Sequence, residues 1–153
     1  MKTAYIELNT SNQINHLVKN QGNKAFCYKG IDFFPNTTVT SLPEILQKKY
    51  RYFVLDIGIL NTYTTKEFLR CDKQFLIGSP SKWKRPEIEE KIELLFSNLT
   101  KQNCFTVIMN LSEKESTLSI FPRYKMVSFP FIANPFQIEP RHFHVLAKLL
   151  ERN

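Results

Sequence analysis

Short apolar runs alternate along the chain with segments of helical spacing, and together they predict its secondary structure. The most pronounced run, YRYFVLDIG, is mostly apolar until it reaches Asp56 and Gly58. Runs of about four to eight apolar residues that end at turn-forming residues are typical of buried strands. We expect a strand region over residues 24–34 and further strands at residues 4–8, 52–56, 75–77, 106–109 and 126–129.

Helices are expected where apolar residues recur every third or fourth position behind a capping residue. Ser41 and Glu44 have the spacing of a capping box, and Pro43 falls in the first turn, where its missing N–H costs little. Thr64 or Thr65 is expected to cap the next helix. The helices are predicted at residues 10–20, 43–49, 64–71, 85–101 and 139–152, the longest with an apolar stripe formed by Ile88, Ile92, Leu95 and Leu99.

The alternation of strands and helices predicts an α/β fold. The run at residues 52–58 is typical of a parallel strand that is covered on both faces. Apolar strands separated by helices indicate a three-layer arrangement, in which helices flank a mostly parallel sheet. No internal repeat, low-complexity tract or linker interrupts the sequence, so we expect a single domain over residues 1–153.

Composition narrows the class of protein but not its activity. Hydrophobic residues make up 42% of the 153 residues, as in an ordinary globular protein, and the formal net charge is +7. The lysines are scattered, so nucleic-acid binding is an alternative that we do not favour. Cys27, Cys71 and Cys104 are isolated and indicate reduced thiols. With no apolar run of membrane-spanning length, we expect a cytoplasmic protein.

Polar residues follow several of the predicted strands, where open parallel sheets bind their ligands. These residues are Glu7, Asn9, Asp56, Gly58, Ser79 and Asn110. Asp56 and Gly58 suit a loop in which a carboxylate holds water on Mg²⁺ while a backbone N–H approaches a phosphate. The alternative is that Asp56 only caps the turn after its strand, which is common turn chemistry.

The order of these segments resembles the MinD/ParA-like branch of P-loop ATPases, which belongs to the SIMIBI class. The resemblance rests on AYIELN, YRYFVLDIG, FLRCDKQFLIGSP with a long helix, FTVIMN and MVSFP, and it spans about residues 4–152. It implies that Glu7 lies where the switch I acid begins, that Asp56 is the Walker B carboxylate and that Asn110 contacts the base. It also aligns Cys71-Asp72 with an Ala-Asp pair and Pro130 with a proline after a late strand.

The P-loop of that family is missing from the sequence. Only three residues precede Ala4, and none of Gly22, Gly30, Gly58 and Gly78 is followed by lysine. Without a nest of backbone N–H groups, a phosphate-binding lysine and a Mg²⁺-binding hydroxyl, phosphoryl transfer loses the positioning that catalyses it. We therefore expect a degenerate domain without ATPase activity or cofactor, which acts as a protein-interaction, dimerisation or localisation module.

An alternative is that the chain is the C-terminal portion of a MinD/ParA-like ATPase whose P-loop is encoded upstream or on another chain. In that case Mg-ATP is the cofactor, and the resemblance implies that Glu7, Asp56, Gly58 and Asn110 bind the nucleotide, with Asp56 on the metal side. A nucleic-acid-binding module is the weaker alternative.

Three further features have both a functional and a structural interpretation. His142 and His144 lack the surrounding ligands of a metal site, so no metal is expected. Trp83, among Lys82, Lys84 and Arg85, is either a contact patch for a partner or an indole packed against the sheet, and we expect packing. The last helix carries an apolar face formed by Val145, Leu146, Leu149 and Leu150. It is expected to dock on the sheet, and membrane binding is not expected.

Overall fold

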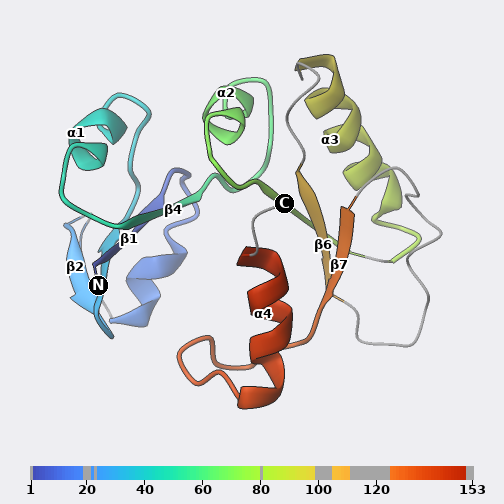
Figure 1. Cartoon of the computed structure of the whole chain (residues 1–153). Helices are drawn as coiled ribbons and strands as arrows, with labels where there is room; N and C mark the ends of the chain where they lie inside the picture. Colours follow the sequence, from blue (N-terminus) through green and yellow to red (C-terminus); the bar gives the residue numbers. More distant parts are fainter. Residues whose placement is uncertain are drawn as a thin grey trace. The chain divides into compact units, whose positions relative to one another are not determined.

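A computed structural model describes residues 2–18, 22, 24–79, 81–98, 105–110 and 125–150 (Figure 1). The chain divides into two units, Met1–Leu60 and Asn61–Asn153. That these units form the single domain expected over residues 1–153 stays a prediction. Cys104, Leu99 and Pro80 lie outside the described residues.

The first unit is built on a four-stranded sheet with the order β2-β3-β1-β4. Its central strand β1 (Thr3–Glu7) runs parallel to both β3 (Ile31–Phe34) and β4 (Tyr52–Asp56), and β2 (Phe26–Tyr28) is antiparallel to β3. The 3-10 helix η1 (Gln13–Leu17) follows β1, and helix α1 (Leu42–Leu46) connects β3 to β4. The strand region expected over residues 24–34 is therefore a hairpin.

The turn of this hairpin explains the division into two strands. Lys29 and Gly30 connect β2 to β3 with φ angles of 51° and 80°. Two consecutive residues with positive φ form the type of tight turn whose twist matches that of the flanking strands. Gly30 adopts this backbone conformation without the steric cost of a side chain.

One face of this sheet packs against α1. Alternate residues of β1 point to that face, so Ala4 and Ile6 are completely buried there. They share a core cluster with Phe34 of β3 and with Leu42 and Ile45 of α1. Burial of these apolar side chains is the main stabilising contribution to the unit, at about 25 cal/mol per Å² of apolar surface.

Two sequence-based expectations are wrong in this unit. Strand β4 is not covered on both faces, because Phe53 and Leu55 pack against the core cluster whereas Tyr52 and Val54 on the opposite face are 48% and 47% exposed. The capping box before α1 does not form. Ser41 lies at the N-cap with a helical backbone, and its hydroxyl donates to the carbonyl oxygen of Thr38 at 3.1 Å. The helix also ends at Leu46, before the predicted residue 49.

The second unit contains a three-stranded parallel sheet with the order β5-β6-β7. Its elements are α2 (Thr65–Leu69), β5 (Phe75–Gly78), α3 (Arg85–Asn98), β6 (Thr106–Asn110), β7 (Lys125–Phe129), the 3-10 helix η3 (Pro140–His142) and α4 (Phe143–Leu150). Parallel strands with helices between them confirm the predicted α/β class. Among the described residues, the strands form one sheet in each unit.

Helix α3 buries the predicted apolar stripe. Ile88, Ile92 and Leu95 are all at most 4% exposed, as expected from their helical spacing. Ile88 lies so close to Gly78 that a Cβ atom at Gly78 would be 2.0 Å from Cδ1 of Ile88. The helix therefore packs closely against the end of β5, where only a glycine leaves room for it.

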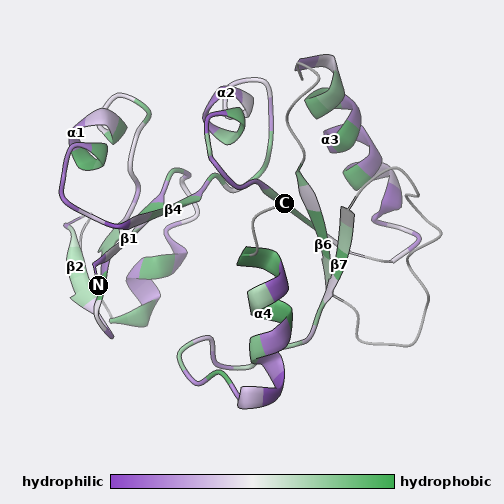
Figure 2. Ribbon diagram, in the orientation of Figure 1, coloured by the Kyte–Doolittle hydropathy of each residue, from purple (hydrophilic) through white to green (hydrophobic). Residues whose placement is uncertain are grey.

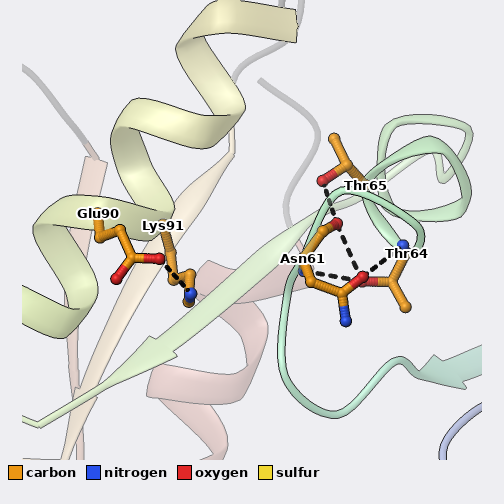
Figure 3. Close-up of polar contacts among 5 residues, drawn as sticks. All are labelled: Asn61, Thr64, Thr65, Glu90 and Lys91. Carbon is orange, nitrogen blue, oxygen red and sulfur yellow. Dashed lines mark hydrogen bonds and ion pairs between the residues drawn. The ribbon is translucent and has the colours of Figure 1, made fainter.

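The N-cap residue of helix α2 is Thr64, one of the two threonines predicted from sequence, but its side chain makes no capping hydrogen bond to the helix. The turn before the helix is closed by Asn61, whose side-chain oxygen accepts hydrogen bonds from the N–H groups of Tyr63 and Thr64 at 2.9 and 3.1 Å. The hydroxyl of Thr65 donates to the carbonyl oxygen of Asn61 at 2.6 Å (Figure 3). Figure 3 also shows the surface ion pair of Glu90 and Lys91 on α3.

Helix α4 combines apolar and polar positions (Figure 2) but has no buried residue. Val145, Leu146 and Leu149 are half-buried, and Leu150 is 68% exposed. The stripe is covered only in part, so the docking on the sheet expected from sequence is wrong as far as full burial is concerned. Among the described residues, no helix has the length and apolar character needed to cross a membrane.

Candidate functional site at the carboxyl ends of β1 and β4

Strands β1 and β4 end side by side, and their last residues are the two acids selected from the sequence. The parallel register pairs Glu7 with Asp56. The N–H of Leu8 donates to the carbonyl oxygen of Asp56 at 2.8 Å, so the pairing continues beyond the strand ends. The structure therefore brings the two carboxylates to one edge of the first sheet, where parallel strands place their functional residues.

Glu7 is fully buried, and its carboxylate accepts hydrogen bonds from the chain itself. Oε1 accepts from the hydroxyl of Ser11 at 3.1 Å and from the N–H groups of Gln13 and Ile14 at 2.8 and 3.4 Å. Oε2 accepts from the N–H of Asn36 at 3.3 Å. Glu7 thus holds the start of η1 and the turn after β3. Three of these four donors converge on Oε1, which anchors that oxygen more firmly than Oε2.

Asp56 is half-buried and has two donors. Oδ2 accepts from the hydroxyl of Tyr5 at 2.7 Å, and Oδ1 accepts from the N–H of Gly58 at 3.0 Å. Burial raises the pKa of Tyr5, and its hydrogen bond to Asp56 raises that pKa further. The phenol therefore stays a donor at neutral pH. Sequence reasoning did not select Tyr5, although alternation along β1 places it on the same side of the sheet as Glu7.

Gly58 is constrained by its contact with Asn9. Its φ of 69° favours glycine, and a Cβ atom at this position would lie 2.9 Å from Cβ of Asn9. The side-chain amide of Asn9 donates to the carbonyl oxygen of Asp56 at 3.0 Å. Asn9 and Gly58, which were selected from the sequence as candidate ligand neighbours, therefore also contribute to the structure of this loop.

The remaining selected residues belong to the second unit. Asn110 is the last residue of β6, and its side chain lies outside the described residues. Ser79 is exposed, and its hydroxyl accepts from the N–H of Ser81 at 3.3 Å. Cys71 is half-buried, and burial, followed by the nearby Asp72 and Glu67, raises the pKa of its thiol. This shift disfavours the reactive thiolate.

The described residues offer little to a metal ion. No group of three or more His, Cys, Asp or Glu side chains among them is arranged to hold one. Glu7 is fully buried and its Oε1 already has three donors, whereas Asp56 is half-buried with one donor on each oxygen, so Asp56 is the more accessible acid of the pair. Mg²⁺ is usually held by one or two carboxylates together with substrate phosphates, so Asp56 alone is an incomplete site.

The exposure of Trp83 contradicts the packing against the sheet that was expected from sequence. The indole is 93% exposed in the turn before α3, and so it is not packed against the sheet. Two of its basic neighbours form ion pairs with acids of α3: Lys84 lies 3.3 Å from Glu87, and Arg85 lies 2.8 Å from Glu89. These ion pairs fix the first turns of the helix and leave the indole at the surface.

Solved structures of other proteins share the fold of this chain. A ParA family ATPase from Chlorobium tepidum TLS matches 97% of this chain and 77% of its own, with a TM-score of 0.59 at 12% identity. The MinD cell division protein of Aquifex aeolicus matches 95% of this chain and 73% of its own, with a TM-score of 0.56 at 15% identity. The chain has a MinD/ParA-like fold.

A third structure with this fold is the MinC:MinD cell division protein complex of Aquifex aeolicus. It covers 96% of this chain and 73% of its own, with a TM-score of 0.58 at 13% identity. No protein-family model matches the sequence, and no curated protein matches it either. At these identities the likeness establishes the MinD/ParA-like fold, which confirms the resemblance inferred from the sequence.

Proposed function

We propose that the chain is a degenerate MinD/ParA-like domain that acts by binding a protein, either a partner or a second copy of itself, and not by hydrolysing a nucleotide. The observation that carries this proposal is the engagement of Glu7 and Asp56 by donors of the chain itself. In this proposal both carboxylates stabilise loops, and Asp56 has the turn-capping role that was its structural alternative in the sequence.

The described residues do not fit Mg-ATP. Phosphate binding by a P-loop requires successive backbone N–H groups that converge on one anion, with a lysine beside them. The glycines with positive φ, which are Gly22, Gly30 and Gly58, are dispersed along the chain, and no glycine precedes a lysine. Catalysis of phosphoryl transfer depends on such positioning, so the fold alone does not supply it.

Exposure of Trp83 supports a binding role. Tryptophan buries a large apolar area when it is covered, and it is enriched among the residues that dominate binding energy at protein interfaces. One of the structures with the same fold is a complex of MinD with MinC, which shows that a protein of this fold assembles with another protein.

Cys27 and Cys71 are free thiols, and we propose a cytoplasmic setting on that ground.

Calorimetry with Mg-ATP tests the absence of nucleotide binding. We expect no affinity tighter than about millimolar, which corresponds to roughly −4 kcal/mol, and no ATPase activity. Micromolar affinity would contradict the proposal.

Sedimentation over a concentration series tests self-association, with Trp83→Ala compared with Tyr63→Ala. Tyr63 is a matched control, since it is also an exposed aromatic residue of the second unit. A selective loss of association in Trp83→Ala is expected, and equal behaviour of the two variants would exclude Trp83 as the contact.

A second candidate function is favoured by the lengths of the matched structures. The alignments cover 95–97% of this chain but only 73–77% of each of the three known structures. Those proteins therefore contain segments without a counterpart in this chain. If another chain or segment supplies a P-loop, Asp56 becomes the metal-side carboxylate of an ATPase. Mg²⁺ with ATP should then raise the melting temperature of the wild type but not of Asp56→Asn. Asp72→Asn, at an exposed acid, is the control.

A further inference from the structure

The first sheet has two outer strands, which differ in how well they are protected against pairing with another molecule. Strand β2 has three residues, and a very short edge strand is one of the features by which proteins prevent such pairing. Strand β4 has five residues and contains neither lysine nor proline, which are two other protective features. Tyr52, Phe53 and Val54 are of types that are enriched in strands. Within the first unit, β4 is therefore the edge that accepts a further strand more readily.

Alternate residues of β4 direct their backbone groups away from β1. The carbonyl oxygen of Asp56 accepts from the N–H of Leu8, so the backbone of Asp56 is directed at β1. By alternation along the strand, the backbone of Val54 is also directed at β1, and the backbone groups of Phe53 and Leu55 are directed to the outer side. Among the described residues of the first unit, no strand pairs with that side. Phe53 and Leu55 thus each present an N–H donor and a C=O acceptor to a further strand.

The two ends of β4 carry opposite charges. Arg51 comes directly before the strand and is exposed, and its guanidinium lies over the ring of Tyr52, with Cζ 5.6 Å from the ring centre. Asp56, the last residue of the strand, is half-buried and accepts one hydrogen bond on each oxygen. An antiparallel strand of the same sequence would place its acidic end beside the basic start of β4, whereas a parallel one would place like charges together.

We propose that β4 pairs in antiparallel orientation with β4 of a second copy of this chain, so that the first sheets of the two copies continue edge to edge. The charges at the two ends of the strand are complementary only in this orientation. The same patch serves both copies, as a twofold symmetric interface requires. The inference rests on the proposed function, in which a second copy is one of the two kinds of partner, and it names the surface that binds this copy.

The outward backbone groups determine the register. In antiparallel pairs, residues that lie opposite each other either exchange both N–H···O=C bonds or exchange none. Phe53 therefore pairs with Leu55 of the second copy and Leu55 with its Phe53, which uses every outward group of the strand. Val54 then lies opposite Val54 of the second copy on the twofold axis, where the two exposed side chains cover each other. At each end of the interface, Tyr52 lies opposite Asp56 of the second copy, which is within reach of the guanidinium over the tyrosine ring.

Sedimentation of the full chain at concentrations up to about 1 mM tests the association, since this range detects weak dimers. Amide exchange at low and at high concentration tests the surface. We expect the N–H groups of Phe53 and Leu55 to exchange about tenfold more slowly once roughly nine-tenths of the chain is dimeric, because exchange then occurs only from the free edge. The N–H of Val54 is directed at β1 in either state and is the internal control. Slow exchange of Phe53 and Leu55 that does not depend on concentration would show that the edge is paired within one chain, and would overturn the proposal.

Val54→Lys tests the centre of the interface. The substitution places two like charges opposite each other on the twofold axis, and a lysine on an edge strand prevents pairing. We expect dimerisation to weaken by at least about tenfold. Val39→Lys is the matched control, because Val39 is a valine of the same unit outside β4 and is 51% exposed, against 47% for Val54. Equal association of the two variants would exclude this edge.

Cysteine cross-linking tests the register. Opposite residues that share no hydrogen bonds have Cα atoms about 4.5 Å apart, within the range of a disulfide. Under a mild oxidant, Val54→Cys should therefore form a disulfide between two copies, which peptide mass spectrometry distinguishes from any bond of the native cysteines. Tyr52→Cys, at a position of similar exposure, lies opposite Asp56 of the second copy and should not cross-link. Equal cross-linking of both variants, or none in Val54→Cys, would overturn the register and the pairing.

Failure of the edge pairing is distinguishable from failure of the proposed function. If Trp83→Ala dissociates the protein and Val54→Lys does not, the edge pairing is overturned while protein binding stands. A wild type that stays monomeric at about 1 mM also overturns the edge pairing, and it leaves a different protein as the partner. Micromolar affinity for Mg-ATP would instead contradict the proposed function, and it would not alter the results of amide exchange and cross-linking at β4.

Discussion

Replacement of Glu7 by glutamine tests whether the buried acid is a structural element of the first unit. The substitution keeps the shape of the side chain but exchanges one accepting oxygen for an amino group. The cheaper orientation directs the remaining oxygen at Gln13 and Ser11, where the hydrogen bonds are 2.8 and 3.1 Å long. The amino group then faces the N–H of Asn36, which now donates to Oε2 at 3.3 Å.

The expected cost follows from these contacts. Opposing the Asn36 N–H with a second donor costs about 1–3 kcal/mol, the penalty of an unsatisfied buried donor. Converting the two shorter hydrogen bonds from charged to neutral acceptors loses about 1 kcal/mol each. Glutamine also avoids the desolvation of a buried carboxylate, which offsets part of the loss. We expect Glu7→Gln to lower the free energy of unfolding by about 2–3 kcal/mol.

Urea unfolding followed by circular dichroism measures this difference, with Glu44→Gln as the control. Glu44 is an exposed acid of α1 in the same unit, and its substitution should change stability by no more than about 0.5 kcal/mol. Amide exchange gives a local reading, because the N–H groups of Gln13 and Ile14 lose their charged acceptor and should exchange faster. A Glu7→Gln variant as stable as wild type, or more stable, would refute a structural role and indicate an acid reserved for a ligand.

Two further predictions concern the same unit. Gly58→Ala should destabilise it by about 1–3 kcal/mol in urea unfolding, because φ is 69° and the added Cβ meets Asn9 at 2.9 Å; an unchanged midpoint would contradict this geometry. Burial and a hydrogen bond to Asp32 raise the pKa of Tyr50 from 10.0 to about 12. The resulting stabilisation is complete below pH 10 and is lost as pH rises through about 12, so Tyr50→Phe should remove this loss.

The positions of the strands could be predicted from sequence because burial imposes a period on the residues. Ala4 and Ile6 alternate with more polar positions, and the run before Asp56 is apolar, so both strands were found within one residue of their ends. The coverage of β4 could not be predicted in the same way. A continuous apolar run does not show which face of a strand is covered, and Val54 points to the face opposite the core cluster.

The turns were the other source of error, because their hydrogen bonds depend on geometry that residue types do not determine. Ser41 has the correct type and spacing for a cap, yet its hydroxyl donates back to Thr38. Thr64 lies at the N-cap of α2 as predicted, yet it makes no capping hydrogen bond, and Asn61 closes the turn before the helix. Trp83 was expected to pack against the sheet from the loop that enters α3, but the turn that contains it leaves the indole exposed to solvent.

The candidate site also could be predicted from sequence only in part. Parallel strands that start in register also end in register, so the proximity of Glu7 and Asp56 could be inferred from sequence. Their partners could not be inferred, because three of the four donors to Glu7 are backbone N–H groups of Gln13, Ile14 and Asn36. Every residue except proline carries such a donor, and sequence does not indicate which of them will point at an acid.

The donors that contact Glu7 and Asp56 bear on the function of these two acids. Two carboxylates side by side at a sheet edge repel each other unless cations or hydrogen-bond donors stabilise their charge. In an ATPase site of this fold class, bound metal and phosphate-binding groups share that task, whereas here η1, the turn after β3, Tyr5 and Gly58 supply donors directly. A Mg²⁺ ion bound by both oxygens of Asp56 would share each oxygen with a donor and weaken hydrogen bonds to a charged acceptor, which contribute about 1.5–3 kcal/mol each. The hydrogen bonds that stabilise the loops therefore compete with a metal ion for the same atoms, and this competition supports the structural role that we propose for the edge.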